Sequence, residues 1–287
     1  MSAQTARVLV LGAAGMLGQD MVRVLADAGW EVVAADRARV DILDRASVRA
    51  AAHGVQVVVN CAAYTDVDGA ESDERAARAV NATGPELIAG VCRDLGIRMV
   101  HVSTDYVFDG EGTAPYPEDH ETSPLGAYGR TKAEGERAVL DSGADALVVR
   151  TAWLYGAGGG CFPRTIARLA RERGRVSVVD DQRGQPTWTV DLATFVTGLL
   201  AASVPAGIYH GTASGACSWF EFALAVVRAA GIDAEVTPAR SAEFPRPAAR
   251  PAWSVLGHNV HRRLGVASIG AWDARWAVAA PQVLAPR

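Results

Sequence analysis

The feature that most constrains the fold is an apolar run that ends in closely spaced glycines near the start of the chain. The run RVLVLG occupies residues 7–12, and the letters that follow it place Gly12, Gly15 and Gly18 three residues apart. A continuous apolar run is typical of a strand covered on both faces, and glycines at its end permit a tight turn into a helix. The stretch therefore predicts the first strand, turn and helix of a strand–helix–strand unit.

The same alternation continues through the first half of the chain. Further β-branched, apolar runs lie at 31–36, 55–63, 97–104 and 146–153. The segments between these runs have helical character, at 16–29, 44–53, 71–95 and about 127–142. Strands that alternate with helices indicate a parallel sheet with helices on both faces. The sequence therefore predicts an α/β fold built on a Rossmann-type, doubly wound parallel sheet.

The composition excludes several kinds of partner. The 287 residues carry a formal net charge of -4 with a pI near 5.9, which gives no basic surface for nucleic acid or an anionic membrane. Every apolar run is shorter than the ~20 residues of a membrane span, and the start of the chain lacks the basic and apolar regions of a signal peptide. The four cysteines are dispersed and are expected to be reduced thiols. We expect a cytoplasmic protein that binds neither nucleic acid nor a membrane.

The glycine spacing also indicates what the first turn binds. Backbone at Gly12, Gly15 and Gly18 can approach a pyrophosphate closely, and the free N–H groups at the start of a helix attract phosphates. We therefore expect these glycines, with Met16 and Leu17 at the start of the helix, to hold a dinucleotide.

The end of the second strand carries signals for two different cofactors. Asp36 lies about 20 residues past the glycine turn, where a carboxylate would bind the ribose hydroxyls of NADH. Arg37 follows it and could instead meet the 2′-phosphate of NADPH, so the sequence leaves NADPH or NADH open. Asp41 and Ile42 are expected beside the adenine, although a plain loop before a helix explains them equally well.

Hydroxyl, phenol and ammonium groups follow later strands. Ser103 and Thr104 end the fourth strand, and Tyr128 and Lys132 lie one helical turn apart in AYGRTK. Ligands of an open α/β sheet bind at the carboxyl ends of its strands, so these groups should border the same crevice as the glycine turn. Because adjacent strand side chains point to opposite faces, one of the two hydroxyls should face the cofactor.

These residue types together suit the reduction of a ketone by hydride. The alkoxide that forms must be protonated, and a tyrosine with its ordinary pKa of about 10 is a weak acid for that task near neutral pH. A nearby ammonium group lowers this pKa, and a hydroxyl donor stabilises the developing charge. We expect Tyr128 to donate the proton, Lys132 to lower its pKa and hold the nicotinamide ribose, and Thr104 to donate to the carbonyl.

A family resemblance extends over nearly the whole chain. In their order, eight stretches resemble those of the dTDP-4-dehydrorhamnose reductase family of extended short-chain dehydrogenases/reductases: LGAAGMLG, NCAAYTDVDGAE, AVNATGP, VHVSTDYVFDG, YGRTKAEGE, VVRTAWLYG, VVDDQRGQPT and RPAWSVL. The stretches STDYVFDG and DDQRGQPT are far more specific than the glycine turn.

The resemblance implies roles for residues at the site. It implies Thr104, Tyr128 and Lys132 as the catalytic trio. It places further residues along the nicotinamide end of the cofactor, namely Cys61, Ala62, Ala63 and Tyr64. It also implies sugar contacts by Asp105, Tyr106 and Trp153.

The resemblance also implies a reaction. This is the NAD(P)H-dependent reduction of the C4 ketone of dTDP-4-dehydro-L-rhamnose to dTDP-L-rhamnose, by a monomer or homodimer. Three alternatives stay open: a related dTDP-4-keto-6-deoxyhexose 4-ketoreductase of antibiotic sugar biosynthesis, a non-catalytic NADP-binding regulatory subunit, and an epimerase or dehydratase of the same superfamily.

Some positions depart from the family pattern. Cys161 stands where asparagine is usual, and Trp188 and Trp253 lie in segments expected near the substrate, so the exact sugar stays open. Some family members bind Mg²⁺ through acidic residues, but no acidic cluster in this sequence commits to a metal site. Asp180 and Asp181 are expected to serve a loop or turn, and His258 with His261 lacks a third ligand.

The chain is expected to divide into two units. Residues 1–155 with about 188–204 should form the NAD(P)-binding Rossmann domain. The regularity weakens after about residue 155, where helices are expected at 162–173, 190–202 and 218–231, a flexible glycine loop at 156–160 and irregular, proline-rich chain at 243–253. Residues about 156–187 and 205–287 should form a smaller, discontinuous C-terminal substrate-binding lobe.

Overall fold

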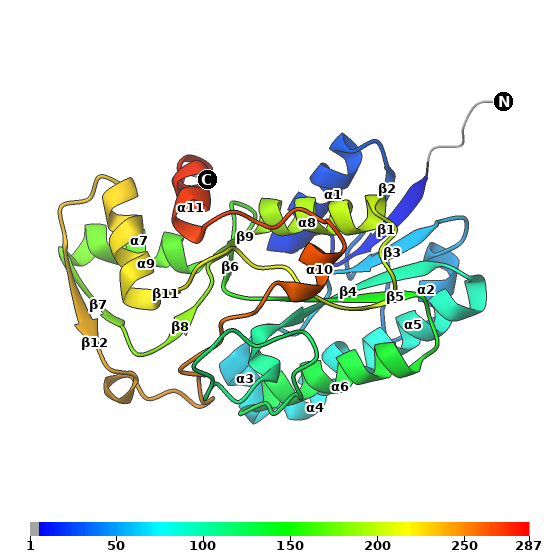
Figure 1. Cartoon of the computed structure of the whole chain (residues 1–287), viewed down its shortest axis with the longest axis horizontal. Helices are drawn as coiled ribbons and strands as arrows, with labels where there is room; N and C mark the ends of the chain where they lie inside the picture. Colours follow the sequence, from blue (N-terminus) through cyan, green and yellow to red (C-terminus); the bar gives the residue numbers. More distant parts are fainter. Residues whose placement is uncertain (1–5, 287) are drawn as a thin grey trace.

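A parallel sheet organises the molecule. The computed structural model describes residues 6–286; residues 1–5, the start of the stretch judged to lack a signal peptide, lie outside the described part. Within residues 6–286 six strands form the sheet in the order β10-β5-β4-β3-β1-β2 (Figure 1). Their bounds are β1 Arg7–Leu11, β2 Glu31–Ala35, β3 Val57–Asn60, β4 Arg98–Thr104, β5 Ala146–Thr151 and β10 Gly207–His210. All the pairings are parallel, so the expected doubly wound, Rossmann-type fold is confirmed.

The strand order changes direction between β1 and β3. The chain runs from β1 outward to β2 and then returns to the other side of β1, where Leu11 pairs with Ala35 on one flank and with Asn60 on the other. Crevices open outside the carboxyl ends of the strands at such a switch point, and ligands bind there.

Helices cover both faces of the sheet (Figure 1). The helices α1 (Met16–Asp27) and α8 (Thr189–Ala201) pack on one face, and α2 (Arg45–Ala51), α5 (Gly84–Leu95) and α6 (Ala127–Asp141) pack on the other. Val8 and Val10 join the first core, whereas Leu9 and Leu11 join the second. Because successive residues contribute to opposite faces, β1 is apolar at every position from Val8 to Leu11 instead of at every second one.

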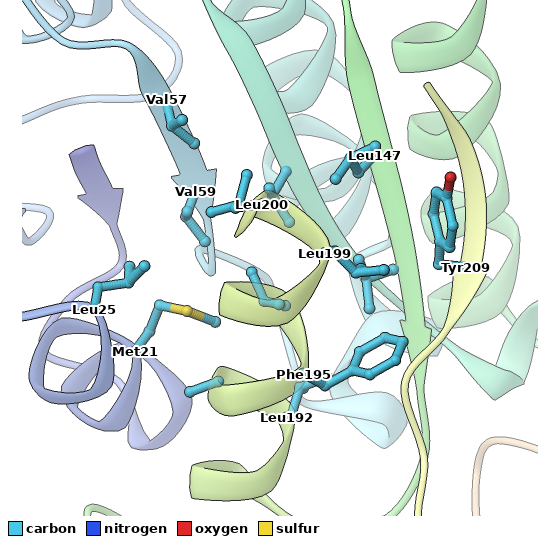
Figure 2. Packing of buried hydrophobic residues seen from close by; sticks show 14 of the residues in the cluster. Met21, Leu25, Val57, Val59, Leu147, Leu192, Phe195, Leu199, Leu200 and Tyr209 are labelled. Atoms are coloured by element: carbon cyan, nitrogen blue, oxygen red, sulfur yellow. The ribbon is translucent and has the colours of Figure 1, made fainter. Parts of the chain in front are cut away.

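Aliphatic side chains dominate the core under α1 and α8. Figure 2 shows Met21 and Leu25 of α1 on one side of α8, and Leu199 and Phe195 of α8 directed towards β5 and Tyr209 on the other. Burying side chains of this kind contributes ~1.5–3 kcal/mol each. The helix α8 therefore belongs with the sheet although it follows the second-half segments in sequence.

The connection between β3 and β4 differs from the single helix expected at 71–95. The chain there forms α3 (Val67–Ser72), α4 (Glu74–Arg78), a π-helix η1 (Ala79–Thr83) and α5. Asp73 separates α3 from α4, because its backbone leaves the helical conformation at the end of one helix and its carboxylate accepts the N–H of Ala76 at the start of the next.

The second lobe is assembled from distant pieces. The helices α7 (Phe162–Arg173), α9 (Trp219–Ala229) and α11 (Trp272–Leu284) lie beside the parallel pair β7 (Arg175–Val179) and β12 (Glu235–Ala239), far from the edge strand β2 (Figure 1). The remaining elements are short: β6 Leu154–Tyr155, β8 Arg183–Gly184, β9 Thr187–Trp188, β11 Cys217–Ser218, η2 Asp105–Val107, η3 Ser241–Glu243 and α10 Asn259–Arg263.

The sheet reaches further along the sequence than expected. The strand β10 pairs with β5, from Gly207 opposite Leu147 to His210 opposite Arg150, although residues 205–287 were assigned to the substrate lobe. A run of four residues without strong alternation gave no signal for this edge strand. Among residues 6–286, none of the helices combines the length and apolar character that crossing a membrane requires.

Candidate active site

The glycine turn leaves the start of α1 open to a ligand. Gly12 has φ +75°, and a Cβ atom there would lie 2.7 Å from the backbone nitrogen of Ala62. A Cβ on Gly18 would collide with the carbonyl oxygen of Gly12. Gly15 is the N-cap of α1 and provides no side-chain cap, so the first N–H groups of the helix remain available to phosphate oxygens. The turn therefore fits a dinucleotide pyrophosphate.

The two side chains at the start of α1 point in different directions. Leu17 is buried in the core under the sheet, so its backbone is the part that faces the turn. Met16 lies against the glycine loop 156–160, where a Cβ on Gly159 would come within 3.0 Å of the Met16 Cβ. Gln19 also donates to the carbonyl oxygen of Gly158 at 3.0 Å. The loop expected to be flexible thus packs against the start of α1, next to the glycine turn, a contact that has no local signal in the sequence.

The end of β2 is arranged around Asp36. Its Oδ1 accepts the backbone N–H groups of Ala38 at 3.0 Å and Arg39 at 3.2 Å, which fixes the turn. Arg37 is exposed at this corner. The Asp41 carboxylate accepts the N–H of Leu43 at 2.9 Å in the loop before α2, and Ile42 packs towards Gly84 at the start of α5.

The segment after β3 is held by an asparagine that sequence reasoning missed. Asn81 of the π-helix accepts the N–H of Tyr64 at 2.8 Å and donates to the carbonyl oxygen of Tyr64 at 3.1 Å. It also donates to the hydroxyl of Thr131 on α6 at 3.2 Å. Asn81 therefore ties the Cys61–Tyr64 segment to the helix of the proposed catalytic residues, and the π-helix marks this position as unusual.

The proposed catalytic trio comes together at the carboxyl end of β4. Thr104 is buried, its Oγ1 donates to the Asp105 carboxylate at 3.0 Å, and it accepts the N–H of Tyr106 at 3.3 Å. The hydroxyl of Thr104 also reaches Tyr128 as a hydrogen-bond partner. Lys132 is 1% exposed and donates to the carbonyl oxygen of Val102 at 2.7 Å.

The protonation of Tyr128 differs from the expectation. Burial raises the pKa of Tyr128 to about 12, the hydrogen bond with Thr104 acts to lower it, and the Asp105 charge raises it. Desolvation therefore outweighs any lowering by Lys132 in the protein without ligand. A tyrosine in this state keeps its proton near neutral pH, which is the form needed to donate one.

The lysine is unusual in this chain. Of the 28 Lys and Arg residues in the sequence, Lys132 is the single lysine. Burial lowers the pKa of Lys132 to about 8, whereas the charge of Glu136 acts to raise it. An ammonium group with this pKa is mostly protonated at neutral pH but titrates within the experimental range.

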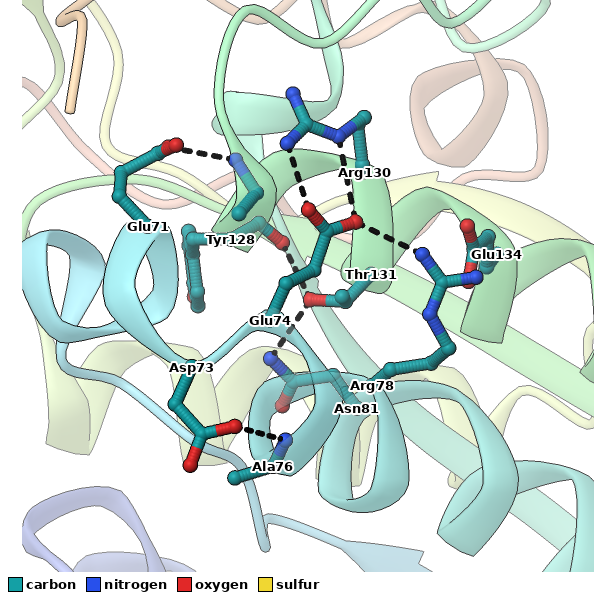
Figure 3. Close-up of polar contacts among 11 residues, drawn as sticks. Glu71, Asp73, Glu74, Ala76, Arg78, Asn81, Tyr128, Arg130, Thr131 and Glu134 are labelled. Carbon is teal, nitrogen blue, oxygen red and sulfur yellow. Dashed lines mark hydrogen bonds and ion pairs between the residues drawn. The ribbon is translucent and has the colours of Figure 1, made fainter.

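Polar contacts from α3, α4 and η1 position the helix α6 (Figure 3). Its N-cap Gly126 has no side chain, and the Oε1 of Glu71 accepts the N–H of Ala127 at 2.7 Å instead. Glu74 pairs with Arg130 at 2.8 Å and with Arg78 at 2.8 Å. The residue before Tyr128 is therefore anchored by a carboxylate 56 positions earlier in the sequence, a contact that spacing along the chain does not reveal.

The residues expected to bind the sugar fall into two groups, Asp105 and Tyr106 next to Thr104 and Trp153 against the core of the second lobe. The Asp105 side chain is buried, and burial raises its pKa to about 6 while the hydroxyls of Ser254 and Thr104 act to lower it. The ring of Tyr106 packs edge-on against that of Tyr128, with centroids 5.7 Å apart. Both follow the proposed donor Thr104 directly.

Trp153 lies on the side of the second lobe. Its φ of 48° is rare for a residue with a side chain, which suggests a backbone held by its surroundings. Its ring is stacked on that of Trp219, with ring centroids 3.5 Å apart and an angle of 4° between the ring planes. The ring of Phe162 packs against Trp219 as well. Trp219 was not singled out from the sequence, since an aromatic residue at a helix start has no distinctive spacing.

The positions that depart from the family pattern serve different contacts. The thiol of Cys161 lies 3.6 Å from the carbonyl oxygen of Gly156, and Trp188 is buried in the core of the second lobe. The indole of Trp253 donates to the carbonyl oxygen of Ala114 at 2.9 Å. Asp181 accepts the N–H and the hydroxyl of Ser241, so it joins its own segment to the start of η3, 60 positions later.

Comparisons with known proteins agree with this geometry. The family described as RmlD substrate binding domain matches residues 6–283. A dTDP-4-keto-6-deoxy-D-glucose reductase of Streptomyces niveus is 48% identical over 272 residues, 93% of this chain and 94% of that protein. A dTDP-4-dehydrorhamnose reductase of Streptomyces griseus is 48% identical over 276 residues, 93% of this chain and 91% of that protein.

A solved structure shows the same architecture over almost the full length. The dTDP-4-dehydrorhamnose reductase of Bacillus anthracis, in complex with NADP, superposes with a TM-score of 0.93 at 35% identity. The match covers 96% of this chain and 99% of that chain.

Proposed function

Because this chain belongs to the RmlD substrate binding domain family, that of the dTDP-4-dehydrorhamnose reductases, we propose that it reduces dTDP-4-dehydro-L-rhamnose to dTDP-L-rhamnose. The observation that carries the proposal is the convergence of Thr104, Tyr128 and Lys132 at the carboxyl end of β4. This end of the sheet also holds the glycine turn, so a bound dinucleotide and the trio share one edge.

The site fits a nicotinamide cofactor, and the Bacillus anthracis relative was solved in complex with NADP. The uncapped start of α1 would bind the pyrophosphate, and Asp36 or Arg37 would bind the adenosine ribose or its 2′-phosphate. The Asp36 Oδ1 already accepts two backbone N–H groups, whereas Arg37 is exposed. This arrangement favours NADPH, with NADH as the weaker cofactor.

The chemistry follows from the protonation states. When bound, the reduced nicotinamide supplies a hydride to the carbonyl carbon. Tyr128, kept protonated by its raised pKa, donates its proton to the ketone oxygen, so one hydride and one proton convert the ketone to an alcohol. Lys132 would hydrogen-bond the nicotinamide ribose and stabilise the tyrosinate left behind. The Thr104 hydroxyl, which donates to Asp105 here, would turn to the substrate carbonyl.

The sugar would lie between the trio and the second lobe. Asp105 and Tyr106 directly follow Thr104, and Trp153 is stacked on Trp219 of the second lobe. We assign the dTDP-sugar to this space and treat residues about 156–187 and 211–287 as the substrate lobe. The protein would act in the cytoplasm as a monomer or homodimer.

A second candidate has specific support. The Streptomyces niveus relative, 48% identical, is a dTDP-4-keto-6-deoxy-D-glucose reductase, and Cys161 and Trp253 differ from the family pattern near the sugar. The two candidates share the reaction and differ in the stereochemistry of the sugar.

One assay separates the candidates. The purified chain is mixed with NADPH and either dTDP-4-dehydro-L-rhamnose or dTDP-4-keto-6-deoxy-D-glucose, and loss of the reduced-nicotinamide absorbance is followed. Faster turnover of the first sugar supports the main proposal, and faster turnover of the second supports the alternative. No oxidation with either sugar, in a chain that still binds NADPH, would contradict both and favour a non-catalytic subunit.

A further inference from the structure

A buried ion pair lies one helical turn beyond the proposed catalytic lysine. Tyr128, Lys132 and Glu136 are spaced four residues apart on α6, so their side chains share one face. Glu136 is 3% exposed and is bound by Arg150 of β5, which is 2% exposed. The guanidinium Nε lies 3.0 Å from Oε1 and 3.1 Å from Oε2, and Nη2 lies 2.7 Å from Oε2.

Arg150 is itself held from other directions. Its Nη1 donates to the carbonyl oxygen of Glu118 at 3.2 Å, and its guanidinium lies over the ring of Phe108, 4.9 Å from the centroid. A planar guanidinium fixed in this way leaves its carboxylate partner little freedom to move. The Glu136 carboxylate is therefore a fixed negative charge inside the protein.

The surroundings of Lys132 contain several titratable groups. The charge of Glu136 acts on it from its own helix, and the Cys61 thiol after β3 and His101 of β4 lie within reach of its charge. Tyr128 lies one turn earlier on the same helix face. Burial and the Lys132 charge hold the pKa of His101 well below its usual range, and burial raises the pKa of Cys61 to about 12. At neutral pH the histidine, thiol and phenol are therefore uncharged, and Glu136 supplies the negative charge of this group.

The geometry points to a further positioning residue: we propose that Glu136, fixed by Arg150, keeps Lys132 protonated for the reaction. This inference rests on the proposed function, in which Lys132 holds the ribose and stabilises the tyrosinate. The buried cluster holds two cations and one anion. Arginine does not lose its proton in proteins, so Lys132 is the group that gives up its charge if the anion is removed.

The sequence adds an independent reason to assign a charge-setting role here. Every other Lys or Arg position, 28 − 1 = 27 of them, is arginine, and lysine occurs only at this buried site. A compact ammonium whose pKa responds to burial and neighbours differs from a guanidinium in the property that the proposal uses. Burial alone works against the charge of Lys132, and the carboxylate of Glu136 works for it.

The single lysine makes a direct test available. Protein labelled with ¹³C at the lysine ε-carbon gives one side-chain resonance, and its shift reports the protonation of Lys132 without substrate or cofactor. The wild-type midpoint is expected near pH 8. In Glu136→Gln the midpoint of the Lys132 titration should fall by about one to two pH units. The fall of kcat/KM at alkaline pH should move to lower pH by the same amount.

Two further variants keep the result interpretable. Glu134→Gln, on the same helix but with a 34% exposed side chain paired to Arg78, should leave the midpoint unchanged. Glu136→Gln removes the carboxylate that pairs with the buried Arg150, so Glu136→Gln/Arg150→Met is made as well to remove the uncompensated charge. In this double variant the midpoint should also fall, but by less.

The outcomes separate the two proposals. A folded single or double variant whose lysine titrates with the wild-type midpoint would overturn the inference and leave the pair a purely structural one. A fall in midpoint together with no turnover by the wild-type chain on either sugar would contradict the proposed function while supporting the charge coupling.

Discussion

The sheet unit and the second lobe of this chain are held together in different ways. The sheet has aliphatic cores on both faces, in which each strand contributes alternate residues to each side. The second lobe has an aromatic cluster of Phe222, Tyr155 and Trp276 in its core, and its strands occur as separate pairs of two or five residues. We propose that the sheet unit holds the reacting groups and that the lobe determines which sugar is bound. Changes in the first should alter chemistry with any substrate, and changes in the second should alter which substrate is used.

The largest expected effect is in the sheet unit. Tyr128→Phe removes the proposed proton donor but keeps the ring that packs against Tyr106, so kcat should fall about 10²–10⁴-fold. Affinity for NADPH, measured by fluorescence titration, should stay within about twofold. Activity near the wild-type level would show that the proton comes from another group.

The contact between β10 of the sheet and the segment around α10, which contains His210, His258 and His261, should make the stability of the chain depend on pH. Burial lowers the pKa of His210 to about 3 and those of His258 and His261 to about 4. In the unfolded chain these histidines bind protons with their ordinary pKa near 6.5, whereas in the folded chain they stay neutral at that pH. Their contribution to the free energy of unfolding is therefore complete above pH 6.5 and is lost as the pH falls towards 4. Between pH 6.5 and 5.5 the three histidines together should lower the free energy of unfolding by about 3 kcal/mol.

Urea unfolding across this pH range measures the effect. His258→Gln should reduce the change in the free energy of unfolding between pH 6.5 and 5.5 by about one third. His53→Gln, at an exposed position, should leave this change as it is in the wild-type chain. A wild-type stability that stays constant from pH 6.5 to 5.5 would mean that these histidines are not buried in their neutral form.

A smaller effect is expected in the second lobe. Trp219→Ala removes the stacking partner of Trp153, so KM for the dTDP-sugar should rise about 10-fold, equivalent to about 1.4 kcal/mol. KM for NADPH should not change. Phe244→Ala, at an exposed position of the lobe, is the control. An equal rise in KM for the sugar and for NADPH would contradict the proposal that the lobe affects sugar binding alone.

The smallest effect should come from an exposed ion pair of the lobe. Arg168 and Glu172 lie one turn apart on α7, and the Arg168 Nη1 is 2.8 Å from the Glu172 Oε2. Both side chains are more than half exposed. Arg168→Ala should change the free energy of unfolding by less than about 0.5 kcal/mol in urea titration. A loss of several kcal/mol would show that the surface of α7 takes part in contacts beyond this pair.

The contrast between the two units also explains what the sequence could predict. The strands β1 to β5 and the helices α1, α6 and α7 follow from apolar runs and helical spacing, which are local properties. The glycine turn and the Tyr128–Lys132 spacing are local as well. The edge strand β10 has a short, featureless sequence, and the single helix expected at 71–95 is broken where Asp73 caps a new one.

The site contacts that the sequence did not reveal are all long-range. Glu71 reaches Ala127 across 56 residues, and Asn81 reaches Thr131 across 50. The raised pKa of Tyr128 was missed for a related reason, because the expectation considered the neighbouring charge and not the burial that the fold imposes. Spacing along a chain carries information about one helix or strand, whereas burial depends on what packs over it.

The central claim is that the Tyr128 hydroxyl and the Lys132 ammonium face one bound nicotinamide. A crystal structure of the chain with NADPH and dTDP tests it most directly. The account predicts the reactive carbon of the nicotinamide beside the Tyr128 hydroxyl, with room for a ketone about 3–3.5 Å from each, and the ribose within hydrogen-bonding distance of Lys132. A nicotinamide bound elsewhere, or a Tyr128 hydroxyl turned away from the ring, would contradict it.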